Sequence, residues 1–234
     1  MTSVSEPAAR RGRARGPSPA KRQAVLRAAR DVFIREGFGG ASLDEVAARA
    51  GVSRQTVYTH FHDKERLFIS MVETEVGGID GPAHPLDATL GETDDVAGDL
   101  QTYARHHLAL VMQPPLVALR RMLIGEAGRF PELAAAWYRE GPERSCRVFA
   151  AWFERLAERE LLRVDDAWLA AQHYNWLVLS IPLNRAMAAP LEPPPYTSDE
   201  LDRYADEAVR VFLAAYGPND DRPRSPTDTA TPPR

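Results

Sequence analysis

A run of long polar side chains begins at Arg54 and has the composition of a surface that contacts DNA bases. An arginine can grip guanine O6 and N7 with two hydrogen bonds, and the neighbouring Gln55 can pair with adenine N6 and N7. Tyr58 follows one helical turn later and can reach phosphates. Val57 and Phe61 are four residues apart, so a helix turns both inward and turns the polar side chains outward. The spacing predicts a short helix whose polar face suits the major groove.

Two helices joined by a tight turn are expected to position this face. Ser42 with Glu45 three residues later is a capping-box pattern, which predicts a helix over residues 43–50. Gly51 follows where the chain must turn sharply, a place that favours a residue tolerating positive φ. Ser53 can then cap the second helix. The sequence therefore predicts a helix-turn-helix.

Helices on either side are expected to complete a small domain. Ser18 followed by Pro19 predicts the start of a helix that ends near Gly37. Asp63 can cap a helix that follows the motif. Lys64, in the first turn of that helix, is disfavoured by the helix dipole, which indicates that its charge serves an outside anion such as a phosphate.

The stretch from Ser42 to Phe68 resembles the DNA-binding domain of the TetR family of bacterial transcriptional regulators. The ordered pattern of that family appears here as Ser42, Val46-Ala47, Ala50-Gly51-Val52-Ser53, Tyr58, Phe61, Lys64 and Leu67. The resemblance implies base or backbone contacts for Arg54, Gln55, Tyr58 and His60, and phosphate contacts for Ser42 and Lys64. With their neighbours on the same helix, the expected DNA-contacting residues are Ser42, Ser53, Arg54, Gln55, Thr56, Tyr58, Thr59, His60 and Lys64.

Metal binding and catalysis are poorly served by the histidines of this chain. His60 and His62 are two residues apart, so a helix points them to different faces, and no cysteine or carboxylate completes a ligand set. The adjacent His106 and His107 diverge for the same reason. No nucleophile, base and orienting group come together in the sequence. We therefore expect no metal, no cofactor and no enzymatic activity.

Charge is distributed unevenly along the 234 residues. Residues 1–66 hold thirteen Lys and Arg against seven Asp and Glu, a net charge of +6, which leaves −10 for the remainder. A basic module on an acidic body suits a polyanion such as DNA. No apolar run approaches the roughly 18 residues of a membrane span, and no hydrophobic signal core is present, so a cytoplasmic location is expected. The lone Cys146 permits no intrachain disulfide, and its neighbouring arginines leave a redox role open.

The rest of the chain reads as helices between polar ends. Residues 1–17 are predicted to be a disordered basic arm, either solvated or in a minor groove, and residues 217–234 a disordered tail. The DNA-binding domain is predicted over residues 18–66 and a helical domain over 67–216, with a hinge region from Gly77 to Asp95. A break is expected at Gly141-Pro142, because proline cannot continue a helix unperturbed. The helices of the second domain are predicted over residues 96–112, 116–129, 131–161, 166–188 and 199–216.

The family resemblance also assigns a role to the second domain. It implies a homodimer formed through the last two long helices and a pocket for a small-molecule effector. The stretch RRMLIGEAGRFPELAAAWYREGPER resembles the AcrR-like and AefR-like branch. Bulky apolar side chains and a few polar anchors are candidate ligand contacts, although each could equally be plain core or dimer interface. These candidates are Tyr103, His106, Leu110, Met122, Phe149, Trp152, Phe153, Asn175 and Trp176.

The sequence thus predicts an all-α protein with an amino-terminal three-helix helix-turn-helix domain and a helical regulatory domain. The expected function is that of a ligand-responsive repressor that binds a palindromic operator as a dimer. Two alternatives remain open. A helical enzyme would need a catalytic set that the sequence does not offer, and a DNA-binding module whose second domain binds a protein partner would need no cavity.

Overall fold

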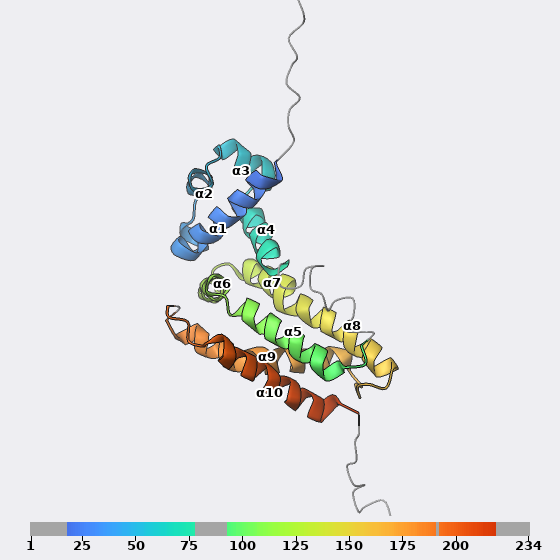
Figure 1. Ribbon diagram of the computed structural model, residues 1–234. Helices are drawn as coiled ribbons and strands as arrows, with labels where there is room; N and C mark the ends of the chain where they lie inside the picture. Colours follow the sequence, from blue (N-terminus) through green and yellow to red (C-terminus); the bar gives the residue numbers. More distant parts are fainter. Residues whose placement is uncertain (1–17, 78–92, 191, 219–234) are drawn as a thin grey trace, which may run out of the picture. The chain divides into compact units, whose positions relative to one another are not determined.

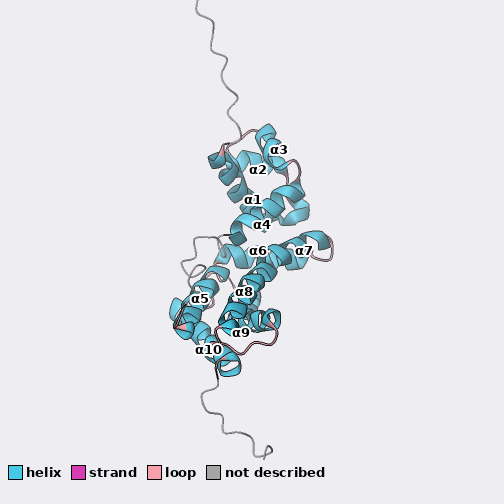
Figure 2. Cartoon of the chain, turned by 90° about the vertical axis from the view of Figure 1, so that its right-hand side faces the viewer, coloured by secondary structure: helices cyan, strands magenta, loops and turns pink. Residues whose placement is uncertain are grey.

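The computed structural model describes residues 18–77, 93–190 and 192–218 (Figure 1). Every regular element within these ranges is helical, which confirms the predicted all-α class (Figure 2). The predicted arm over residues 1–17, most of the predicted hinge and the predicted tail beyond residue 218 lie outside the described residues. In chain order the elements are α1 Pro19–Gly40, α2 Leu43–Ala50, α3 Arg54–Phe61, α4 Lys64–Gly77, α5 Val96–Val111, α6 Pro114–Glu126, α7 Pro131–Tyr138, the π-helical turn Arg139–Glu143, α8 Arg144–Glu158, α9 Ala167–Ala188 and α10 Ser198–Tyr216.

The chain forms two compact units that divide between Met71 and Val72, inside α4. The predicted domain boundary lies slightly earlier, after residue 66, at the point where the recognisable motif ends. A helix that runs across a boundary carries no local mark of the division, because its hydrogen-bond pattern is continuous.

The first unit is organised around aromatic rings from α1 and α4. The rings of Phe33 and Phe38 stack with centroids 5.6 Å apart, and Phe68 meets both edge-on. Val57 and Phe61 of α3 are also buried. Burial of this inner face turns the polar face of α3 outward, as the four-residue spacing predicted.

The second unit has a continuous apolar core built by α5, α8, α9 and α10. Four fully buried rings of Phe149, Phe153, Tyr174 and Phe212 pack with centroid distances of 5.0 to 6.4 Å. The Tyr174 hydroxyl donates a hydrogen bond to the carbonyl oxygen of Leu100 at 2.8 Å, and burial raises the pKa of this phenol. The buried hydroxyl is therefore paired and neutral, and it fastens α9 to α5.

The helix predicted over residues 131–161 is split, as the Gly141-Pro142 pair indicated. Residues Arg139–Glu143 adopt a π-helical turn that contains Pro142, and α7 and α8 lie on either side of it. A wide turn of this kind accommodates a residue without a backbone N–H inside a helical path. Pro182 lies inside α9, whose prediction took no account of it.

Among the described residues, no single helix is long and apolar enough to cross a membrane. Helices α5 and α6 are bent by 65° relative to each other. Taken together, this pair has the length and apolar composition of a span, but neither helix has them alone.

Candidate DNA-binding surface and internal pocket

Local capping contacts set the two helices of the motif. The Ser42 hydroxyl accepts a hydrogen bond from the Glu45 backbone N–H at 3.2 Å, and the Ser53 hydroxyl accepts one from the Thr56 N–H at 3.1 Å. Gly51 has φ +65°, the left-handed conformation that its place in the turn predicted. Only half of the predicted capping box forms, because the Glu45 carboxylate pairs with Arg35 of α1.

The outer face of α3 carries the side chains predicted to contact bases. Arg54, Gln55 and Thr59 are exposed, and Tyr58 is half-buried beside them. The Thr59 hydroxyl donates to the Gln55 carbonyl oxygen at 2.7 Å, so it is engaged within the helix. His60 is half-buried with its ring 5.8 Å from that of Phe61. Arginine, glutamine and tyrosine therefore supply the accessible chemistry of this face.

Arg54 is held between the two helices of the motif. Its Nε lies 2.8 Å from one carboxylate oxygen of Asp44, and a terminal N–H donates to the other at 3.0 Å. A second terminal N–H donates to the Tyr58 hydroxyl at 3.3 Å, and the guanidinium carbon lies 5.4 Å from the centre of that ring. Tyr58 and Asp44 together raise the pKa of Arg54. These contacts engage three of the five N–H donors of the Arg54 guanidinium, and a base that pairs with its Nε edge would displace the Asp44 carboxylate.

Lys64 contacts carbonyl groups at the end of α1. Its ammonium group donates to the carbonyl oxygens of Phe38, Gly39 and Ala41 at 2.7, 3.3 and 3.1 Å, and it lies 4.7 Å from the centre of the Phe38 ring. An ammonium group has three N–H donors, so these carbonyls use all of them. In this conformation the Lys64 ammonium group is engaged within the protein, and its contact with a phosphate stays a prediction. The lysine secures the end of α1, where Gly37 at φ +69° interrupts the helix.

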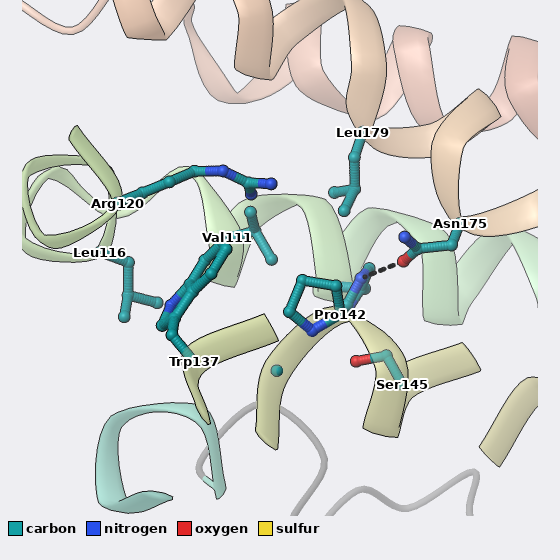
Figure 3. Close-up of a pocket in the computed structure, with 10 residues that line it drawn as sticks. Val111, Leu116, Arg120, Trp137, Pro142, Ser145, Asn175 and Leu179 are labelled. Atoms are coloured by element: carbon teal, nitrogen blue, oxygen red, sulfur yellow. Dashed lines mark hydrogen bonds between the residues drawn. The ribbon is translucent and has the colours of Figure 1, made fainter. Parts of the chain in front are cut away.

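A pocket in the second unit has about 510 Å³ of empty space when the part that is open to solvent is counted (Figure 3). Side chains from five elements line it: α5, α6, α7, α8 and α9, together with the π turn. The bend at Gly141-Pro142 contributes one wall, because the chain there cannot pack as a regular helix. The lining residues are His107, Val111, Leu116, Arg120, Trp137, Gly141, Pro142, Ser145, Asn175 and Leu179.

Only Asn175 of the predicted ligand contacts lines this pocket. Most of the large aromatic candidates, Tyr103, Phe149, Trp152 and Phe153, are packed in the core. His106 is exposed, and it is the adjacent His107 that points inward. Leu110, Met122 and Trp176 are half-buried and are not among the lining residues. The expectation that these eight residues line a pocket is wrong for the cavity observed, because bulk and apolarity mark core residues as readily as pocket residues.

Arg120 is the charged residue that the sequence analysis missed. Its guanidinium carbon lies 4.7 Å from the centre of the Trp137 ring and 5.9 Å from that of Trp176. Figure 3 shows the side chain extending from α6 over the pocket towards Leu179. Burial lowers the pKa of Arg120 to about 10, so the group still carries its charge at neutral pH. The Arg120-Arg121 pair could have identified this residue in the sequence. Neighbouring residues on a helix point in different directions, so one of the two arginines can face the interior.

The opposite wall of the pocket carries the polar side chains of Asn175 and His107. The Asn175 side chain is 1% exposed, and its Oδ1 lies 3.3 Å from Nε2 of His107. Its Nδ2 has no hydrogen-bond partner among the residues that the structure describes. A buried amide nitrogen without a partner is uncommon in native proteins, and it marks a place where an acceptor is missing.

One face of α9 and α10 exposes apolar side chains. Leu169, Leu177 and Ile181 lie at four-residue multiples on α9, so they share one side of the helix, and Val211 of α10 is exposed as well. A shallow groove runs between the two helices and is lined by Leu169, His173, Leu177 and Val211 among others. Within the described residues, no group of three or more His, Cys, Asp or Glu could hold a metal ion.

Comparison with known proteins finds similarity to regulators in both units of the chain. Residues 25–71 match the family described as bacterial regulatory proteins, tetR family, and residues 98–218 match the AefR-like transcriptional repressor, C-terminal domain. The second match alone spans more than half of the chain. Both matches agree with the resemblance that the motif residues indicated.

Two solved structures are similar over almost their full length. A protein of Mesorhizobium loti MAFF303099, assigned to the TetR family, is 38% identical with a TM-score of 0.76, covering 86% of this chain and 99% of that one. The flavonoid-responsive regulator FrrA is 31% identical with a TM-score of 0.68, covering 87% of this chain and 100% of that one. The HTH-type transcriptional activator FasR of Mycolicibacterium smegmatis is 39% identical over 70 residues, which are 30% of this chain and 32% of FasR. The match to FasR therefore spans about a third of that protein's length.

Proposed function

Because the chain belongs to the TetR family of bacterial transcriptional regulators, we propose that it represses transcription by binding a near-palindromic operator as a homodimer, in the cytoplasm. The observation that carries this proposal is the outer face of α3, where Arg54 and Gln55 stand exposed over a buried inner face. The proposed DNA contacts are Ser42, Ser53, Arg54, Gln55, Thr56, Tyr58, Thr59 and His60.

The apolar face of α9 and α10 supports a homodimer. Exposed Leu177 and Ile181 would lose contact with water if a second copy covered them, and burial of apolar surface stabilises association. A two-fold axis places the same face of each copy against the other. The same symmetry requires two operator half-sites in inverted orientation, about 34 to 36 Å apart or a multiple of that distance.

The internal pocket supports a response to a small molecule. A second domain that served only a protein partner would have no need of a cavity lined by Arg120, Trp137 and Asn175. An effector releases the operator only if it binds the DNA-incompetent conformation more tightly than the competent one. A tenfold preference is worth about 1.4 kcal/mol. Repression is proposed because the matched carboxy-terminal family is described as that of a repressor, although the similar FasR is an activator.

The first experiment is selection of bound duplexes from a random DNA pool by the full-length protein, followed by sequencing. We expect an enriched inverted repeat. The double variant Arg54→Ala, Gln55→Ala is the control, and it should enrich no such repeat while remaining a folded dimer. Enrichment of unrelated single sites, or of nothing at low salt, would contradict the proposal.

A further inference from the structure

The charge balance of the internal pocket points to the chemistry of its occupant. None of its lining residues is an aspartate or a glutamate. Arg120 forms no ion pair or hydrogen bond with any described residue, and its guanidinium lies over the indole rings of Trp137 and Trp176. Burying a charge without an opposite charge is costly, and ring quadrupoles offset only part of that cost. The pocket therefore holds one cation that lacks a counter-charge.

The neighbouring arginine shows what a structural role looks like in the same helix. Arg121 donates to the carbonyl oxygens of Ala186 and Ala189 at the end of α9. Its charge thus stabilises the end of a helix dipole. Arg120 makes no such contact with any described carbonyl group, so the two indole rings hold its side chain but supply no hydrogen-bond acceptor for its N–H groups.

The two rings that flank Arg120 leave a defined way to approach it. Aromatic stacking involves the faces of a planar guanidinium, whereas its hydrogen-bond donors lie in the plane at its edge. That edge fits a carboxylate with two parallel hydrogen bonds. With a single cation in the pocket, a monoanion would be neutralised, whereas a dianion would carry buried excess charge.

The other walls of the pocket indicate the chemistry of the rest of the ligand. Val111, Leu116 and Leu179, with Pro142, offer only apolar surface to the middle of the pocket. At the far wall, the unpaired Nδ2 of Asn175 lacks an acceptor. The amide is oriented by His107, whose Nε2 lies 3.3 Å from Oδ1. A donor held in this way selects an oxygen or nitrogen acceptor.

We infer that the effector is an apolar monocarboxylate, with its carboxylate on Arg120 between the two indoles and an acceptor atom near its other end on Asn175. This inference rests on the proposed function for its regulatory meaning, but the binding itself does not depend on DNA. It also assigns distinct tasks to the two ends of the pocket: Arg120 selects the charge, and Asn175 selects the far polar atom.

The test uses aryl and alkyl carboxylates of increasing length, each paired with its neutral carboxamide, with and without an ether oxygen at the far end. Binding to the full-length dimer is measured by calorimetry without DNA. We expect at least one acid to bind at least tenfold more tightly than its amide. Arg120→Gln should abolish that preference by weakening acid binding far more than amide binding, and Arg120→Lys should restore part of the preference. Arg155→Gln, an exposed arginine of α8 outside the pocket, should bind as the wild type does.

Several results would overturn the inference: no acid binds, amides bind as tightly as acids, or Arg120→Gln retains the preference. An ether oxygen at the far end should increase the affinity for the wild type but not for Asn175→Ala. An equal increase in the variant would contradict the proposed contact with Asn175. A separate operator-release assay keeps the two proposals distinguishable. Acids that bind but leave the operator bound would contradict the effector function, whereas release by neutral compounds alone would contradict only the carboxylate.

Discussion

At the scale of single residues, the Asp44 carboxylate competes with DNA for Arg54 on the outer face of α3. In the protein by itself, Arg54 forms an ion pair with Asp44, which lies in the first turn of α2. Both side chains are more than half exposed, so the pair contributes little to folding. We expect its effect to fall on DNA binding, because a base contact through the Nε edge of Arg54 would replace a contact with Asp44.

Arg54→Ala should cost about 1 to 3 kcal/mol of operator affinity and relax the base preference at one position in each half-site. The loss arises because a two-pronged contact to one base edge disappears. Binding to the operator and to a set of single-base variants measures it. A uniform loss across every base variant would place Arg54 on the DNA backbone instead.

Asp44→Asn should tighten operator binding by up to about fivefold at low salt, since an exposed ion pair is worth at most about 1 kcal/mol and no longer has to be broken. The removal of a negative charge also favours a polyanion. Glu65→Gln, an exposed carboxylate in the first turn of α4, is the matched control for charge alone. An equal gain in both variants would show that release of Arg54 contributes nothing.

At the scale of elements, long cationic side chains fasten helix ends that the chain brings close together. Lys64 binds the carbonyls that end α1, Arg121 those that end α9, and Arg163 donates to Gly217 and Ala215 at the end of α10. Each of these cations satisfies carbonyl groups that have no partner within their own helix. The helix ends are therefore held by tertiary contacts in addition to local caps.

Lys64→Met should lower the free energy of unfolding by about 1.5 to 3 kcal/mol, the usual worth of hydrogen bonds to a charged group. Methionine keeps most of the aliphatic length and removes the ammonium donors. Urea unfolding measures the change, with Arg66→Met, an exposed residue of the same helix, as control. Operator binding by the folded variant should keep its salt dependence, and a flatter dependence would restore a phosphate contact for Lys64.

The start of α10 should weaken in acid. The Thr197 backbone N–H and hydroxyl lower the pKa of Glu200 below its usual 4.5 through the capping box. The folded state therefore prefers ionised Glu200, so this contribution is present above pH 4.5 and is lost as the pH falls through the lowered pKa. Melting temperatures from pH 6 to 3 should fall less steeply in Glu200→Gln than in the wild type. Parallel curves would contradict a role for this carboxylate.

At the scale of the whole molecule, α9 and α10 present a face of exposed apolar side chains. Ile181 is 58% exposed there, whereas a side chain of the same type and exposure, Ile124 at 59%, lies on α6. If the first face is the dimer interface, only one of the two isoleucines is covered in the assembly. Substitutions at Ile181 and Ile124 therefore separate the effect of burial in the interface from the effect of the residue type.

Ile181→Glu should convert the dimer to a monomer and abolish high-affinity operator binding, because each copy would place a charge in an apolar interface. Ile124→Glu should remain dimeric and bind the operator normally. Sedimentation velocity gives the oligomeric state, and the operator titration gives the affinity. A dimer that survives Ile181→Glu with full affinity would move the interface elsewhere.

The residues within one turn of each other determined the DNA-binding motif. The bounds of α2 and α3, the Ser53 cap and the left-handed Gly51 all follow from interactions between residues at most four apart, which a sequence displays directly. The bend at Gly141-Pro142 was equally legible, because proline lacks a donor wherever it stands.

Only the tertiary structure decided the tasks of Lys64, Arg120 and His107. Lys64 meets carbonyls more than twenty residues away, and Arg120 lies beside indoles from two other helices. His107 faces inward and His106 outward because of how α5 packs, although the two are chemically identical in sequence. A side chain's partner across the fold depends on the distances between helices, and one-dimensional spacing carries no record of those distances.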